Sequence, residues 1–70
     1  MKKLVVDIKE FSQMLCVSTR HMWRMDIEGK IPMAIKLGSR LKRWSVKEIE
    51  LWVDNGMPPR VLWMKMKEKL

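Results

Sequence analysis

The segment between Ser18 and Gly29 constrains the fold most, because it carries both a start signal and a stop signal for one short helix. The Ser18 hydroxyl can accept a hydrogen bond from a free backbone N–H of the first helical turn. Gly29 readily adopts the left-handed conformation that ends many helices. The spacing predicts a helix of about three turns. Met22 and Met25 fall on one side of it, so we expect that side to be buried.

The opposite side of this helix carries residues that can contact DNA. Arg side chains can fork onto guanine edges in a major groove, and Thr and Trp can add hydroxyl and apolar contacts. We assign DNA contacts to six residues, with His21 at the border of the two sides: Ser18, Thr19, Arg20, His21, Trp23 and Arg24. An ordinary solvated face is the alternative that this helix alone leaves open.

A second helix is expected just before this one. Asp7 and Glu10 have the spacing of a capping box, which predicts a helix from Ile8 to Leu15. Its predicted buried stripe consists of Ile8, Phe11, Met14 and Leu15. Cys16 and Val17 would form the tight turn, with Cys16 as a small packing residue rather than a reactive thiol. Two helices joined this way predict a helix-turn-helix.

A β-hairpin is expected after Gly29. Pro32 disfavours further helix, and the pattern predicts strands over 33–37 and 40–44 joined by a two-residue type II′ turn, Gly38–Ser39. In the second strand Trp44 shares its alternation with Arg40 and Lys42. Because strict alternation would bury two cations together with the Trp, we expect a bulge or a strand that ends before Trp44.

Positive charge is concentrated on this hairpin. The chain has 15 Lys and Arg against 8 Asp and Glu, which gives a net charge of +7. Residues 36–44 contain four of the basic residues and none of the acidic ones. Such an acid-free patch beside a candidate recognition helix indicates a polyanionic partner, although a solubilising surface is the simpler alternative. We assign hairpin contacts with DNA to Lys36, Ser39, Arg40, Lys42 and Arg43.

Two further helices are expected in the C-terminal part. Ser45 and Glu48 form a second capping-box pattern, and the helix that follows should end at Gly56. Its apolar stripe is Val46, Ile49, Trp52 and Val53, and we place Trp44 and Trp52 in the core. Pro59 can be the first residue of a last helix that runs to about Lys69.

The face of the last helix that carries Trp63 and Met66 has two interpretations. The simpler is that it packs on the preceding helix. The alternative is that it contacts a protein partner or a second copy on DNA.

Composition limits the other classes of function. With one Cys and one His, the chain predicts no internal disulfide, no metal site and no cofactor. No nucleophile–base pair, paired carboxylates or phosphate-binding glycine loop is present, so we do not expect an enzyme. No apolar run approaches the about 20 residues of a membrane span. We expect a cytoplasmic, nucleoid-associated protein of a bacterial or phage-infected cell.

The sequence resembles the small AlpA and excisionase-type DNA-binding proteins of phages and integrative elements. The resemblance covers about residues 7–60, and its motifs occur in the family's order: Cys16–Met25, Glu28–Pro32, Lys36–Arg40, Arg43–Ser45 and Glu48–Trp52. It implies a mainly α winged helix-turn-helix with a small β-hairpin as the wing. The expected division is a DNA-binding domain over 1–56 and a helical extension over 57–70 packed on it. Cys16 and Asp26 depart from the family pattern, which usually has Gly at the first position and an apolar residue at the second.

The resemblance implies sequence-specific binding of double-stranded DNA. The second helix would enter the major groove, and the wing would contact the backbone or minor groove. Such proteins regulate excision genes or act as recombination directionality factors, so integrase or another recombinase, RNA polymerase and self-association on DNA are the expected partners. A winged-helix interaction module that recruits a protein through its apolar C-terminal helix is the alternative function.

Overall fold

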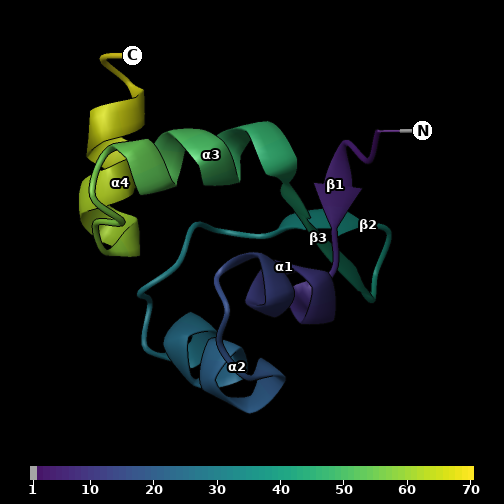
Figure 1. Cartoon of the computed structure of the whole chain (residues 1–70). Coiled ribbons are helices and arrows are strands. Elements are labelled where there is room, and N and C mark those ends of the chain that lie inside the picture. The colour runs from purple at the N-terminus through teal and green to yellow at the C-terminus, as the bar shows by residue number, and fades with distance from the viewer. Residues whose placement is uncertain (1) are drawn as a thin grey trace.

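The computed structural model describes residues 2–70, and within them four helices accompany a three-stranded antiparallel sheet (Figure 1). In chain order the elements are β1 (Val5–Val6), α1 (Ile8–Met14), α2 (Thr19–Ile27), β2 (Ile35–Leu37), β3 (Leu41–Ser45), α3 (Val46–Asp54) and α4 (Arg60–Lys67). Strand β3 lies between β1 and β2. The arrangement is compatible with a helix-turn-helix fold, in which α2 follows α1 across a short turn.

Local capping signals set the limits of α1 and α2 as predicted. The Asp7 carboxylate accepts from the Glu10 backbone N–H at 2.8 Å, and the Glu10 side chain accepts from the Asp7 N–H at 3.4 Å, which completes the capping box. At α2 the Ser18 hydroxyl accepts from the His21 N–H at 3.0 Å. Gly29 has a φ of 71°, the left-handed conformation expected just after the helix.

The prediction that Cys16 packs in the turn is wrong. Cys16 is exposed and has a φ of 59°. This left-handed conformation strains residues with a Cβ atom and is easy for glycine. The backbone, rather than a lack of space, therefore makes this position suitable for glycine.

The hairpin is one residue out of its predicted register. Leu37 pairs with Leu41, so the turn has three residues, Gly38 to Arg40, instead of two. The strands are correspondingly Ile35–Leu37 and Leu41–Ser45. The longer turn places two leucines opposite one another, whereas the predicted turn would have placed Leu37 opposite Arg40.

The predicted bulge before Trp44 is also wrong. Strand β3 continues through Trp44 to Ser45, and its pairing with β1 and β2 is regular throughout. Trp44 is buried, whereas the side chain of Lys42, on the same face of the strand, is 46% exposed. The core reaches along β3 only as far as Trp44, and the part of the hairpin nearer its turn projects away from the core. The Trp44 ring is therefore buried, while Arg40 and Lys42 with the same alternation stay in solvent.

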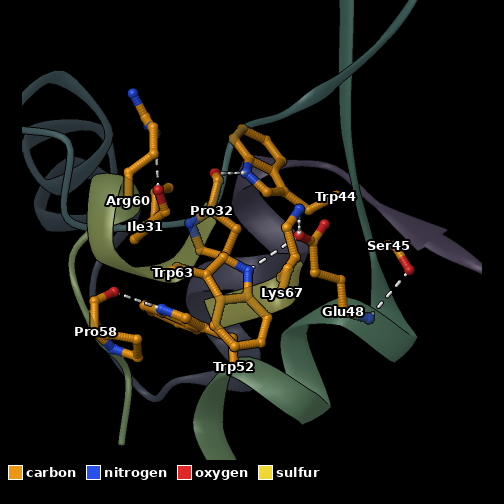
Figure 2. Close-up of polar contacts among 10 residues, drawn as sticks. All are labelled: Ile31, Pro32, Trp44, Ser45, Glu48, Trp52, Pro58, Arg60, Trp63 and Lys67. Atoms are coloured by element: carbon orange, nitrogen blue, oxygen red, sulfur yellow. Dashed lines mark hydrogen bonds and ion pairs between the residues drawn. The ribbon is translucent and has the colours of Figure 1, made fainter. Parts of the chain in front are cut away.

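Aromatic rings form the centre of the core. The ring of Phe11 lies 5.6 Å from that of Trp44 and 6.1 Å from that of Trp52, in tilted and edge-on geometry. Each of these two buried indole N–H groups has an acceptor: Trp44 donates to the Pro32 carbonyl and Trp52 to that of Pro58, both at 2.8 Å (Figure 2). The buried apolar residues are Val6, Phe11, Met22, Ile31, Trp44, Ile49, Trp52 and Trp63.

Helices α3 and α4 pack on one another at this core. Trp63 of α4 is 1% exposed and Met66 is half-buried, so this face of α4 is turned inward. The predicted stripes hold in part, because Met14 of α1 and Val53 of α3 remain 42% and 41% exposed. Pro59 precedes α4 as its N-cap rather than as its first helical residue.

The second predicted capping box is only half present. The Ser45 hydroxyl accepts from the Glu48 N–H at 3.1 Å. The Glu48 carboxylate does not return to the helix start and instead accepts from the Trp63 indole at 3.1 Å (Figure 2). The Glu48 carboxylate thus accepts from the Trp63 indole N–H of α4 in place of the Ser45 backbone N–H that a capping box would use.

Candidate nucleic-acid interface

Five of the six contact residues predicted for the recognition helix are exposed, and four of these five lie within α2. Met22 is fully buried and Met25 half-buried, which fixes the rotation of the helix on the core. The side chains on the other side are accordingly exposed: Arg20, His21, Trp23 and Arg24. Trp23 keeps 42% of its surface exposed, unlike the other three Trp residues, which are buried.

The two residues at the start of α2 have local partners. The Ser18 hydroxyl caps the helix, and it is exposed. Thr19 is half-buried, and its hydroxyl oxygen lies 3.3 Å from that of buried Ser12 on α1. Thr19 therefore faces the joint between the two helices as much as the exposed surface of α2.

The predicted hairpin residues differ in how free their side chains are. Lys36, Ser39 and Arg40 are exposed. Arg43 is half-buried, and its Nη1 donates to the backbone carbonyl of Lys42 at 2.8 Å. Lys42 Nζ lies 3.7 Å from a carboxylate oxygen of Asp26.

Helix α2 and the hairpin lie side by side. Trp23 of α2 lines a shallow hollow together with Arg40, Lys42 and Arg43 of the hairpin, and Trp44 forms its inner part. Asp7 and Ile8 complete the lining. The fold thus brings Trp23 of α2 next to three of the predicted hairpin contact residues, although they are separated in sequence.

The predicted contact residues of α2 and the hairpin include six Lys and Arg residues. Within residues 2–70 no carboxylate forms an ion pair with five of these six cations, Arg20, Arg24, Lys36, Arg40 and Arg43. Lys42 is the exception, through Asp26. Unpaired cations favour binding of a polyanion, because each can neutralise a phosphate without breaking an internal ion pair.

Sequence reasoning missed the role of Asp26 and Arg60. Asp26 lies near the end of α2, and its carboxylate accepts from Arg60 Nη2 of α4 at 2.7 Å. The two residues are 34 positions apart, so no local pattern indicates this pair. One signal was available from the family pattern. Most members have an apolar residue at the position of Asp26, which indicates that this position is shielded from solvent.

No helix in residues 2–70 is both long enough and apolar enough to cross a membrane. Neither the curated proteins nor the solved structures contain a match to this chain. One protein-family model does match, over residues 5–57, and it describes the prophage CP4-57 regulatory protein AlpA. The match spans most of the chain, including both helices of the helix-turn-helix, the hairpin and α3. The chain therefore belongs to the AlpA family of prophage regulatory proteins.

Proposed function

We propose that this protein binds double-stranded DNA sequence-specifically and without catalysis. Helix α2 would enter the major groove, which is wide enough for one helix. The β2–β3 hairpin would act as the wing of a winged helix-turn-helix and contact the neighbouring backbone or minor groove. The observation that carries the proposal is the hollow in which exposed Trp23 of α2 adjoins Arg40, Lys42 and Arg43 of the hairpin. Arg20 and Arg24 are exposed on the same helix as Trp23.

The two elements would have different tasks. Arg20 and Arg24 extend from a helix that can insert into the groove, so they would read base edges. Arg40 lies in the hairpin turn and lines the same hollow as Lys42 and Arg43, where a backbone contact is the natural role. Specificity would come from α2, and much of the sequence-independent affinity from the hairpin.

Alanine variants test this division on a duplex selected from a random-sequence pool. Arg24→Ala should weaken binding to the selected duplex by about 1–3 kcal/mol and relax the preference at one base position. Arg40→Ala, the matched removal of one exposed Arg, should weaken the selected and a shuffled duplex equally. A uniform loss in both variants would show that α2 does not read sequence.

As a prophage regulator, the protein would act at a promoter of excision genes or as a recombination directionality factor at an attachment site. Partners would be RNA polymerase in the first case and an integrase or other recombinase in the second. A footprint on the host and prophage DNA separates the two roles by its position.

The alternative function, recruitment of a protein through α4, keeps one supporting observation. Val61 and Leu62 are 70% and 49% exposed on α4, whereas Trp63 is buried. A recruiting surface would therefore use the outer face of α4 rather than the predicted Trp63 face. Val61→Asp should abolish recruitment in that case and leave DNA binding unchanged.

A further inference from the structure

Arg60, the first residue of α4, is hydrogen-bonded to the segment that ends α2. Its backbone N–H donates to the Gly29 carbonyl and its Nε to the Ile31 carbonyl, both at 2.9 Å; the second bond is drawn in Figure 2. Its Nη2 donates to the carboxylate of Asp26 at 2.7 Å and to the Asp26 backbone carbonyl at 3.2 Å. Residue 60 lies outside the segment that matches the family model. These contacts fix the C-terminal end of α2 to α4.

The Asp26 carboxylate extends this connection to the hairpin. One of its oxygens accepts from Arg60, and the other lies 3.7 Å from Lys42 Nζ on β3. The side chain of Asp26 is 12% exposed and that of Arg60 is 23% exposed, so both groups are largely shielded from solvent. An ion pair in such a place is screened less than one on the surface. Three elements, α4, α2 and β3, thus meet at one carboxylate.

This carboxylate is the polar link between α2 and the hairpin. Helix α2 packs mainly on α1. Among the hydrogen bonds and ion pairs of residues 2–70, the Asp26–Lys42 pair is the one that joins α2 to β3. A recognition site functions only when its side chains are held close to the required geometry by the groups behind them. The Asp26–Lys42 pair is thus a polar restraint on how α2 lies beside the hairpin, and Arg60 in turn holds the Asp26 carboxylate.

We propose that Arg60 is a positioning residue for DNA recognition, which acts through Asp26 and Lys42 to hold α2 and the hairpin in one register. The inference rests on the proposed function. On a shuffled duplex, the Asp26 carboxylate would also keep Lys42 from pairing with a DNA phosphate. Lys42 would contact a phosphate only when α2 is bound in the major groove of the selected duplex. A merely structural Arg60 would affect thermal stability alone and leave the preference for the selected duplex intact.

The first test compares Arg60→Gln with Lys67→Gln. Each variant removes one positive charge from α4, but Lys67 pairs with Glu48 of α3 rather than with α2. The readout is the ratio of affinities for the selected and shuffled duplexes, measured well below the thermal midpoint. Arg60→Gln should lower this ratio about fivefold or more, the effect of one misplaced base contact. Lys67→Gln should leave it unchanged.

The second test compares Asp26→Asn with Glu28→Gln. Both remove one negative charge near the end of α2, and Glu28 pairs with Lys30 at 3.4 Å instead of the hairpin. The amide that replaces the Asp26 carboxylate can still accept from Arg60, but it no longer holds Lys42 by charge. Asp26→Asn should tighten binding to the shuffled duplex and steepen its log–log salt slope by about 0.9, one added phosphate contact. Glu28→Gln should change neither quantity.

The outcomes separate the inference from the proposed function. If the wild-type chain does not bind duplex DNA or shows no preference for the selected sequence, the proposed function fails. If the wild type discriminates but Arg60→Gln keeps its ratio, or both α4 variants lower it equally, the inference is overturned. If Arg60→Gln does not fold, Asp26→Asn decides alone, and an unchanged salt slope or one matched by Glu28→Gln overturns the inference.

Discussion

The indole N–H of Trp63 donates a hydrogen bond to the carboxylate of Glu48, with 3.1 Å between Nε1 and Oε2. Lys67, one turn further along α4, donates to the same oxygen at 2.5 Å. The Trp63 ring is buried, so the carboxylate satisfies a donor that would otherwise lack water. One side chain of α3 therefore holds α4 through two donors.

We expect Glu48→Gln to lower the free energy of unfolding by about 1–2 kcal/mol, because a charge-assisted acceptor is replaced by a neutral one. Glu50→Gln is the matched control, since Glu50 is an exposed residue of the same helix. Urea denaturation measures both. An equal loss in the two variants would show that the effect comes from charge on α3 and not from the contact with α4.

Removal of the Trp63 ring should unfold the protein or bring it close to unfolding. Truncation of a buried aromatic side chain to Ala costs about 3–5 kcal/mol, and small domains are stable by only about 5–15 kcal/mol. Deletion of residues 60–70 should cause global unfolding for the same reason. The thermal midpoint by circular dichroism measures this, with Val61→Ala as the exposed control. A deletion variant with an unchanged midpoint would place α4 outside the core.

Replacement of Cys16 by Gly should stabilise the protein by about 1 kcal/mol. The φ of 59° strains a residue with a Cβ atom, and glycine relieves the strain at some cost in chain entropy. Met57→Gly, at a φ of 55°, should act in the same direction. Glu28→Gly, at a φ of −80°, is the control and should destabilise. Stabilisation by all three or by none would refute the conformational explanation.

The fold was predictable where its signals are local. Ser18 and Gly29 limit α2, and Asp7 with Glu10 starts α1, because each cap depends on residues within one turn. The buried positions of Phe11, Trp44 and Trp52 agree with the sequence pattern. These features need only periodicity and capping chemistry.

The remaining features depend on distant partners. Alternation along β3 could not show that the core ends at Trp44, since this is set by the elements packed against the strand. The Glu48 carboxylate has a distant partner in Trp63, and the Asp26 carboxylate has one in Arg60. The predicted contact residues of α2 and the hairpin could be named from sequence, but the hollow that Trp23 shares with Arg40, Lys42 and Arg43 is set by the fold.

Stability at acid pH should depend on Glu10. The pKa of its carboxyl is lowered below the ordinary 4.5, first by the hydrogen bond from Lys3 and then by the Asp7 backbone N–H. Because the folded pKa is the lower one, the stabilisation is present above pH 4.5 and is lost as the pH falls through the folded value. An NMR titration should give a Glu10 pKa below 4.5 that rises in Lys3→Gln. An unshifted pKa in the wild type would contradict this.

If cations of α2 and the hairpin contact DNA phosphates, the affinity of the protein for DNA must fall steeply as the salt concentration rises. The affinity of the wild-type chain for a selected duplex would be measured by fluorescence anisotropy between about 50 and 200 mM salt. With roughly four to six phosphate contacts, we expect a log–log slope of about −4 to −5. A flat dependence on salt, or no binding at the lowest salt, would contradict it.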